Sequence, residues 1–324
     1  NKPLKSIFQT SRYKLKVKEF MKNLHAEFDE MLDEQNWLDN ETKATIKEKN
    51  AAITYNIVQL DRAMNNTFLK NFYKNFTVKK DNFIKNVLAV KEETFFKNMR
   101  LLREPYEFDL GIKPQQFFGY YYPQENEIGW SPTTIEPPLF ENNIPAAINC
   151  GGIGFVLAHE LIHAFGNQGL FYNKSGYEGI WWDNQTIGIY KQRQQCLIDQ
   201  YSNFFYMQAN KSLNGTISIN ENLSDVSGIK LAFRMYEKYY KTNASQQFRL
   251  PGIDYSNDQL FFINFAQIWC GVVAASNAEY YATTIHSPSE FRVYGSVQNS
   301  EYFAKVFNCS LGSKMNPVDK CQPW

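Results

Sequence analysis

Apolar residues recur at steps of three and four along much of this chain, which is the spacing of amphipathic helices. In residues 15–50 the pattern runs through "VKEFMKNLHAEFDEMLDE" and "WLDNETKATIKEKNAAI", and Asp39 or Asn40 is expected to cap the second helix. The same spacing predicts helices over 82–104, 147–166, 186–210, 221–241 and 257–270.

From about residue 115 the pattern changes. The stretch "QQFFGYYYPQENEIGWSPTTIEPPLF" is aromatic and interrupted by Pro and Gly, which is typical of short strands joined by ordered loops. No internal repeat or low-complexity linker is present. The chain is therefore expected to be mainly α with a small β-sheet, an α+β fold.

The composition of the chain argues against some classes of function. With 324 residues, 44% of them hydrophobic, the chain can bury a large core. The net charge of +1 provides no general attraction to nucleic acid, so no nucleic-acid partner is expected. The sequence contains no run of 18 or more apolar residues, so it predicts no membrane-spanning helix within this chain. The start, "NKPLKSIFQTSRYK", lacks an initiator Met and a signal peptide, so we expect an upstream part of the same protein.

Five cysteines stand at 150, 196, 270, 309 and 321 without a C-x-x-C spacing, which argues against a cysteine-based zinc site and leaves disulfides or buried thiols. Ten Asn-x-Ser/Thr sequons accompany them, and together they predict an extracellular, N-glycosylated protein. The sequons begin at Asn40, Asn65, Asn75, Asn173, Asn184, Asn210, Asn214, Asn222, Asn243 and Asn308.

The segment "VLAHELIHAFGNQG" carries the clearest chemistry. His159 and His163 are four residues apart in an apolar helix, so both rings leave from one face and can bind one metal ion. Glu160 follows the first histidine, where its carboxylate can reach a metal-bound water without binding the metal. The alternative is a helix that merely carries surface His and Glu.

A catalytic zinc needs a third protein ligand. The chain has four histidines, and the remaining two are His25 and His286. The segment "ENLSDVSG" provides a better candidate, because Glu221 and Asp225 share one helix face. Glu221 could bind zinc while Asp225 accepts the second ring N–H of a zinc-bound histidine. Without the His-Glu motif, the alternative interpretation of this acidic pair, two side chains on an exposed turn of a helix, would be preferred.

Five segments together resemble the neprilysin and endothelin-converting-enzyme family of zinc endopeptidases: "NCGGIGFVLAHELIHAF", "ENLSDVSG", "LFFINFAQIWCG", "HSPSEFRVYGSVQNS" and "MNPVDKCQPW". The resemblance extends in order over nearly the whole chain. It implies a thermolysin-like zincin catalytic domain over residues 82–324. Residues 1–81 would be the C-terminal part of a helical domain that roofs the active site.

The resemblance also implies roles for individual residues. His159, His163 and Glu221 match ligands of one Zn²⁺, Glu160 the general base, and Asp225 the carboxylate behind a ligand. His286 matches a histidine that stabilises the oxyanion, and Arg292 an arginine that binds a substrate carbonyl. An apolar pocket for the residue after the scissile bond matches four positions, for which the alternative is ordinary core: Phe155, Val156, Leu139 and Trp269.

For the cysteines, the resemblance implies a disulfide between Cys196 and Cys321. Cys270 and Cys309 match positions that are bonded to the upstream part, although a bond between these two is an alternative. Cys150 stands where the family usually has another residue, and is expected to be a free or inter-subunit thiol.

Two departures from the family concern substrate backbone and terminus. The family's Asn-Ala pair on an edge strand reads Gly119-Tyr120 here, which removes about two hydrogen bonds of ~1 kcal/mol each. Near the end of the chain, Gln322 replaces an arginine that would hold a substrate's free carboxylate.

Two further departures concern transition-state groups. Gly166 replaces an aspartate, so Arg292 is expected to lack its orienting carboxylate. Thr284 replaces another aspartate that would orient His286. These changes predict weakened or altered catalysis.

Three functions are compatible with these residues. The favoured one is a zinc-dependent endopeptidase that cleaves peptides on the amino side of apolar residues. The alternative is a catalytically impaired zinc-binding member that acts as a binding or assembly subunit, and the third is a structural protein without metal. Glu160 favours the enzyme, because a structural zinc site has no use for a general base.

Overall fold

A computed structural model describes residues 11–57, 65–76, 78–103, 119–131, 134–135, 137–242 and 247–324. Residues 115–118 of the aromatic stretch and the sequon at Asn243 lie outside these ranges. The two helices predicted within 15–50 are α2 (Ser11–Asp33) and α3 (Asn40–Ala52). Asp39 is the cap of α3, because its side chain accepts the backbone N–H of Thr42 at 2.8 Å.

The aromatic stretch forms strands, as its composition predicted. Strands β1 (Thr54–Ile57), β3 (Glu127–Trp130) and β2 (Gly119–Tyr122) form one sheet in that order. β1 runs parallel to β3 and β2 runs antiparallel to it, so that Tyr120 lies opposite Gly129. A second pair consists of β4 (Phe205–Tyr206) and β5 (Lys211–Ser212). Among the described strands, β2 lies at the edge of this sheet.

The helix predicted over 147–166 is divided into three parts. They are α7 (Ala146–Asn149), a π-helical turn (Cys150–Gly154) and α8 (Phe155–His163). The π-helical turn packs closely against backbone from elsewhere, since a Cβ at Gly152 would lie 2.4 Å from the carbonyl oxygen of Leu139. Such tertiary contacts are invisible to hydrophobic periodicity, which is why the division was not predicted.

Two other predicted helices have different ends. α9 (Asn184–Ser202) ends before residue 210, because the chain turns into β4. α10 (Gly215–Met235) begins before residue 221, because the Asn214 side chain caps the N–H groups of Thr216 and Ile217. A π-helical turn (Tyr236–Tyr240) then extends α10 over the rest of the predicted range.

The remaining helices include two predicted and four unpredicted ones. α6 (Phe83–Arg100) and α11 (Asn257–Gln267) agree with the predicted ranges. The unpredicted helices are short: α5 (Asn66–Phe72), α12 (Ala278–Thr283), α13 (Ser289–Gln298) and α14 (Glu301–Val306). The predicted fold class, mainly α with a small sheet, is confirmed.

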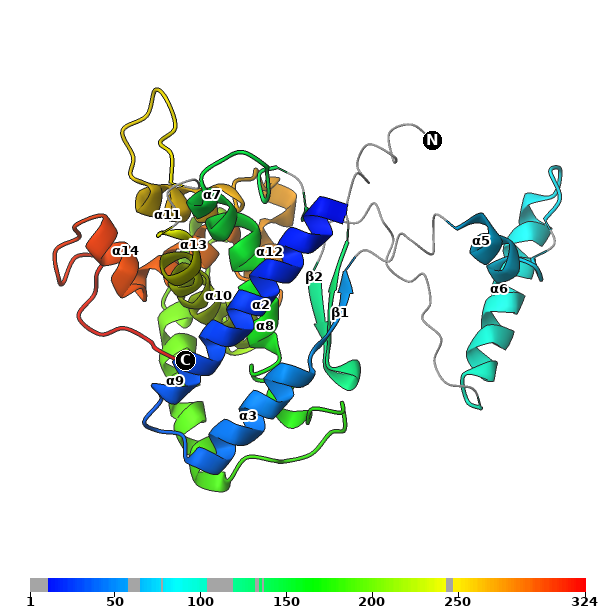
Figure 1. Ribbon diagram of the computed structural model, residues 1–324, viewed down its shortest axis with the longest axis horizontal. Coiled ribbons are helices and arrows are strands. Elements are labelled where there is room, and N and C mark those ends of the chain that lie inside the picture. The colour runs from blue at the N-terminus through cyan, green and yellow to red at the C-terminus, as the bar shows by residue number, and fades with distance from the viewer. Residues whose placement is uncertain are drawn as a thin grey trace.

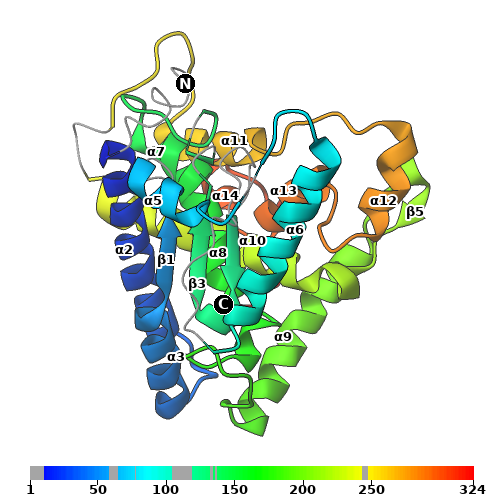
Figure 2. The ribbon, with the colours of Figure 1, turned by 90° about the vertical axis from the view of Figure 1, so that its right-hand side faces the viewer.

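Helix α10 is central to the main body, with α8, α9 and α2 packed against it (Figures 1 and 2). One hydrophobic core runs from α2 to the last residue. In this core Trp324 is only 1% exposed, and its ring contacts the rings of Phe28, Tyr190, Trp182 and Trp37. This aromatic cluster ties α2 and α9 to the C-terminal segment.

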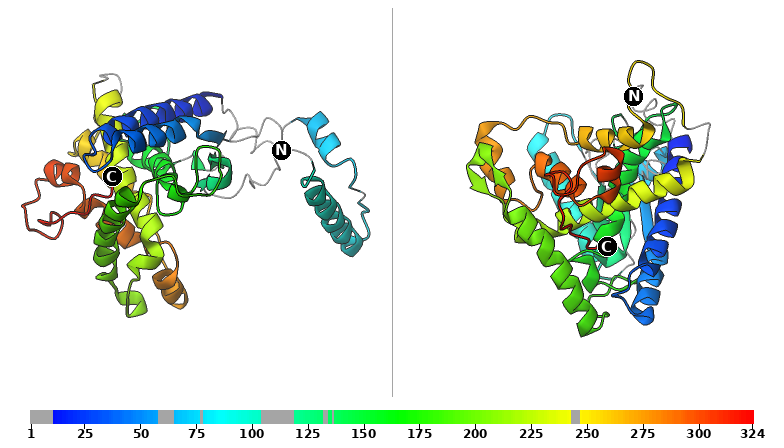
Figure 3. Two further views of the ribbon diagram at one scale, coloured as in Figure 1. Left: turned by 90° about the horizontal axis from the view of Figure 1, so that it is seen from below. Right: turned by 90° about the vertical axis from the view of Figure 1, so that its left-hand side faces the viewer.

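α5 and α6 stand beside this body in two perpendicular views (Figures 1 and 3). Neither helix has a buried residue. The α6 segment nevertheless carries large apolar side chains, with Phe83 and Leu102 each 79% exposed. Among the described helices, none is long and apolar enough to cross a membrane.

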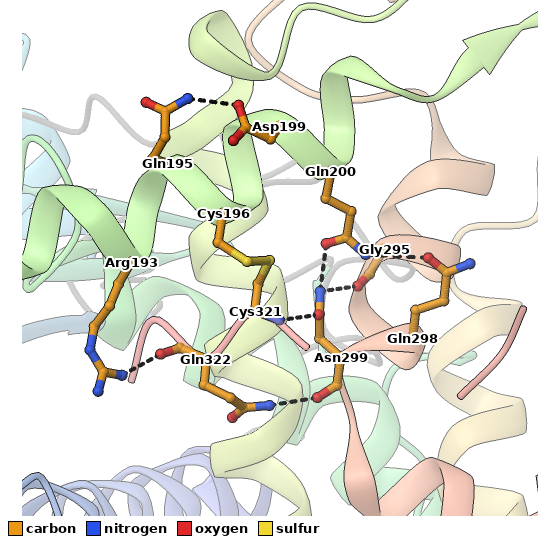
Figure 4. Close-up of a disulfide and its surroundings, with 10 residues drawn as sticks. All are labelled: Arg193, Gln195, Cys196, Asp199, Gln200, Gly295, Gln298, Asn299, Cys321 and Gln322. Carbon is orange, nitrogen blue, oxygen red and sulfur yellow. Dashed lines mark hydrogen bonds between the residues drawn. A yellow bond between two sulfur atoms is a disulfide. The ribbon is translucent and has the colours of Figure 1, made fainter. Parts of the chain in front are cut away.

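The disulfide between Cys196 on α9 and Cys321 is present, as the family resemblance implied (Figure 4). Cys270 and Cys309 are both free, so the alternative bond between them is absent. Cys150 is free and fully buried, and burial raises the pKa of its thiol. Of the two alternatives expected for Cys150, the free thiol is confirmed, and burial leaves its sulfur no exposed surface for a bond to another chain.

The sequons differ in accessibility. Asn222 has no exposed surface, so a glycan cannot be attached there in the folded protein. Asn65 and Asn214 are exposed but cap helices with their side chains.

Candidate active site

Three side chains form a group that could hold a metal ion, and within the described ranges it is the only such group of His, Cys, Asp and Glu. His159 and His163 come from α8 and Glu221 from α10. The two Nε2 atoms are 2.9 Å apart, and they lie 3.3 and 3.6 Å from the two oxygens of Glu221. Four tetrahedral ligands about 2.05 Å from zinc are separated by roughly 3.3 Å, so this donor set fits zinc.

Nδ1 of His159, the ring nitrogen that does not face His163 and Glu221, faces a buried carboxylate. This nitrogen lies 2.8 Å from Oδ1 of Asp225, which has no exposed surface. Asp225 in turn accepts from Nε and Nη2 of Arg292, both at 2.6 Å. The expectation that Arg292 lacks an orienting carboxylate because of Gly166 is thus wrong, since Asp225 from α10 provides one.

Nδ1 of His163 faces uncharged groups. Both the Asn220 amide nitrogen and the Ser224 hydroxyl lie 3.1 Å from Nδ1 of His163. Asn220 and Ser224 precede Glu221 and Asp225 by one residue each, so two adjacent rows of α10 face the two histidines.

Burial and neighbouring charges set the protonation of this group. Burial lowers the pKa of His159, but Asp225 and Glu221 outweigh burial and raise it to about 9. Burial and the nearby charge of His159 lower the pKa of His163 to about 3. Burial opposes ionisation of Glu221, but its hydrogen bonds with His159 and His286 hold the pKa of this carboxyl well below its usual range.

Glu160 lines the same cavity and is 7% exposed. Burial raises the pKa of its carboxyl to about 7, against the opposing charge of His159. A Cβ at Gly119 would lie 3.0 Å from Oε1 of Glu160, so the edge strand β2 passes directly over this carboxylate. A carboxyl with a pKa near neutrality is suited to accept and return a proton.

His286 lies at the open side of the group. Its side chain is half exposed, and Nε2 is 3.2 Å from Oε2 of Glu221. His286 therefore has an acidic neighbour although Thr284 replaces the family's aspartate.

The cavity has a volume of ≈ 400 Å³, within the usual range for ligand sites. Eleven of the twelve site residues expected from the sequence line it, and the twelfth, Asp225, lies behind His159. The eleven are Tyr120, Leu139, Phe155, Val156, His159, Glu160, His163, Glu221, Trp269, His286 and Arg292.

The apolar part of the cavity is formed by packed rings. Phe155 contacts Trp269 edge to face, and the guanidinium of Arg292 lies 4.1 Å from the centre of the Trp269 ring. Leu139 and Phe155 are almost fully buried, whereas Val156 and Trp269 are half-buried at the cavity wall. This wall could accommodate an apolar side chain.

The Gly119-Tyr120 pair presents backbone to the cavity. Successive side chains of a strand point to opposite faces, so that of Tyr120 points away from the face where Gly119 meets Glu160. The Tyr120 ring covers Gly129, where a Cβ would lie 2.1 Å away, and its hydroxyl donates to Glu127. The Tyr120 ring therefore packs on the sheet face opposite Glu160.

Gln322 lies outside the cavity wall, beside the disulfide (Figure 4). Its amide nitrogen donates to the carbonyl oxygen of Asn299, and its backbone carbonyl accepts from Arg193. Gln322 thus joins the C-terminal segment to α9 and the α13–α14 turn.

Asn220, Ser224 and Gly119 were not predicted as site residues. For Asn220 and Ser224 the sequence contained a signal, namely their four-residue spacing next to Glu221 and Asp225. For Gly119 the family resemblance placed the residue on the edge strand, but its approach to Glu160 was not predicted, because it depends on how β2 packs on α8.

Known proteins of one peptidase family are similar to this chain. The model of peptidase family M13 matches residues 119–322. An endothelin-converting enzyme homolog of Locusta migratoria is 37% identical over 293 residues, covering 89% of this chain and 40% of that protein. Neprilysin of Oryctolagus cuniculus is 35% identical over 312 residues, covering 95% of this chain and 42% of that protein. The chain spans about two fifths of the length of these relatives.

Solved structures share the fold. Zinc metalloprotease Zmp1 of Mycobacterium tuberculosis, in complex with an inhibitor, has a TM-score of 0.81 at 26% identity, covering 94% of this chain and 46% of that one. A chain of the Haemonchus galactose-containing glycoprotein complex has a TM-score of 0.83 at 24% identity, covering 99% and 50%, which is a likeness of fold alone. With the family model matching well over half of it, this chain belongs to peptidase family M13, the metallopeptidases to which the relatives neprilysin and endothelin-converting enzyme are assigned.

Proposed function

We propose that this protein is a zinc-dependent endopeptidase that cleaves peptides on the amino side of apolar residues. One zinc would be held by His159, His163 and Glu221. The observation that carries the proposal is the buried Glu160 carboxylate, which shares one cavity with a His-His-Glu group of zinc-compatible spacing.

Zinc bound at this group would lower the pKa of a bound water to ~7 and polarise a substrate carbonyl. Glu160 would take a proton from the attacking water and deliver it to the leaving amine, as its raised pKa permits. Asp225 would keep the Nδ1 proton of His159 in place, so that Nε2 faces the metal.

The surrounding residues would bind the peptide. The cavity-lining residues of β2, an edge strand of the described sheet, could contact an extended substrate. Arg292 uses two of its five N–H groups on Asp225, so three are left for a substrate carbonyl. His286 would donate to the charge that develops on the carbonyl oxygen. Phe155, Trp269 and their neighbours would receive the apolar side chain.

The test is cleavage of a diverse peptide library by zinc-loaded protein and by Glu160→Gln. We expect the variant to keep one zinc and lose ~10²–10⁴-fold in kcat, since the general base is removed. The matched control is Glu41→Gln on the exposed surface of α3. Equal cleavage by wild type and Glu160→Gln would overturn the proposal. If the wild type binds zinc but cleaves nothing, the alternative of a non-catalytic binding or assembly subunit is supported.

We further propose that an upstream part of the same protein is a partner of this chain. The exposed apolar side chains of α6, and the free cysteines Cys270 and Cys309, support this proposal. The upstream part would cover α6 and form disulfides with both cysteines. Non-reducing peptide mapping of the complete protein tests this, and free thiols at both positions would contradict it.

The division into residues 1–81, as part of a roofing helical domain, and 82–324 as the catalytic domain stays a prediction. α2, α3 and β1 share the hydrophobic core and sheet of α8, α10 and β3, so the two parts would be held together tightly. An extracellular location is supported by the disulfide, which forms in oxidising compartments. Glycan mapping of the secreted protein tests this location.

A further inference from the structure

The two histidines of the proposed metal group are supported unequally. Nδ1 of His159 faces the carboxylate of Asp225, whereas Nδ1 of His163 faces an amide and a hydroxyl. A metal-binding imidazole holds its proton on the nitrogen opposite the metal, and this proton needs an acceptor to fix the ring. For His163, that acceptor must come from Asn220 or Ser224.

Asn220 shows a mismatch that points to its role. Its amide nitrogen faces Nδ1 of His163, while its amide oxygen is buried with no hydrogen-bond partner in the described structure. If Nδ1 carries a proton, two donors oppose each other and an acceptor is unused. A 180° rotation of the amide exchanges the two ends. The oxygen then accepts from Nδ1–H, at the 3.1 Å separation that the nitrogen now has.

Gly166 makes room for this side chain. A Cβ at position 166 would lie 2.9 Å from the Asn220 amide oxygen, closer than such atoms approach without displacement. Gly166 has no positive φ, so the backbone would accept alanine there. The Asn220 amide therefore fits in its present position because residue 166 has no side chain.

We infer that Asn220 is a positioning residue for His163, with Ser224 as its companion, and that it sets zinc affinity through a neutral hydrogen bond. The inference rests on the proposed zinc site. Because a carboxylate raises the basicity of an imidazole more than an amide does, the His163 side of the site is the weaker one. Replacing the amide by a carboxylate should therefore strengthen zinc binding.

The test measures the zinc Kd of the complete protein by chelator competition, together with the melting temperature of the zinc-free form. We expect Asn220→Ala to weaken zinc binding ~10- to 100-fold and Asn220→Asp to tighten it. Gly166→Ala should weaken it by displacing the amide, and should add little in the Asn220→Ala background. The matched control is Asn222→Ala, also buried on α10 but bonded to Ser218 and Ser287, which should leave the Kd within about twofold.

The outcomes separate the two proposals. A wild-type protein that binds no zinc would overturn both the zinc site and this inference. Tight wild-type binding with an unchanged Kd in Asn220→Ala would overturn the inference alone. An equal loss in Asn222→Ala would also overturn it, because the effect would then be a general loosening of α10.

Discussion

Arg292 and Asp225 form a two-point ion pair, with Nε–Oδ2 and Nη2–Oδ1 distances of 2.6 Å, and the same carboxylate lies 2.8 Å from Nδ1 of His159. One buried acid from α10 thus orients both a proposed metal ligand and a proposed substrate-binding arginine. The loss of an acid at Gly166 therefore leaves this arginine oriented.

Replacing Asp225 by asparagine should disturb both neighbours. We expect Asp225→Asn to weaken zinc binding ~10- to 100-fold, because the amide supports the His159 N–H less strongly. The unpaired charge of buried Arg292 should also lower the free energy of unfolding by ~3–5 kcal/mol. Chelator competition and urea unfolding measure the two effects. Asp258→Asn, at a partly exposed ion pair with Lys241, should change neither by much, and an equal effect there would contradict this explanation.

Lys49 links α3 to the segment after α8. It is 1% exposed, and Nζ donates to the carbonyl oxygens of Ala164, Gly169 and Tyr172 at 2.6–2.8 Å. Lys49→Met would leave three carbonyls without this donor, so we expect a loss of ~2–4 kcal/mol in the free energy of unfolding. Lys47→Met, which removes an exposed bond to Asp33, should cost under ~1 kcal/mol. Urea denaturation checks both, and similar losses would show that Lys49 has no special role.

His25 should make the protein sensitive to acid. Burial between α2 and α3 lowers the pKa of His25 to about 4, although a hydrogen bond with Asn50 opposes this. Between about pH 6.5 and 4 the unfolded chain binds a proton that the folded protein does not, so stability falls as the pH is lowered. At ~1.4 kcal/mol per pKa unit the contribution is at most ~3.5 kcal/mol.

We therefore expect His25→Gln to flatten the loss of stability between pH 6.5 and 4. Urea unfolding of zinc-free protein at several pH values measures this without interference from zinc release. Parallel curves for wild type and variant would show that His25 does not titrate in this window.

The Cys196–Cys321 bond closes a loop of 125 residues. In the chain-entropy model such a loop destabilises the unfolded state by about 5 kcal/mol. We expect the double variant Cys196→Ser, Cys321→Ser to lose ~2–5 kcal/mol of unfolding free energy, measured in urea. Cys270→Ser, at an exposed free thiol, is the control in this chain. A double variant as stable as this control would contradict the prediction.

Much of the local structure was predictable from the sequence. The positions of α2, α3, α6 and α11 followed from hydrophobic spacing, because that spacing reports which residues share a helix face. For the same reason, the pairing of His159 with His163, and of Glu221 with Asp225, was visible before the two helices were seen together. The π-helical turn Cys150–Gly154 and the short helices α12 to α14 were not, because their conformation depends on neighbours far away in the chain.

By itself, the sequence determined the helical faces and the residue types that could bind a metal and move a proton. Only the tertiary structure decided which groups support them. Asp225 serves Arg292 as well as His159, Asn220 occupies the space beside Gly166, and Cys150 is sealed in the core. The first two depend on how α8, α10 and α13 pack together, and the third on how the π-helical turn packs against α10 and α11. Such packing brings together side chains more than fifty positions apart, which no local periodicity can report.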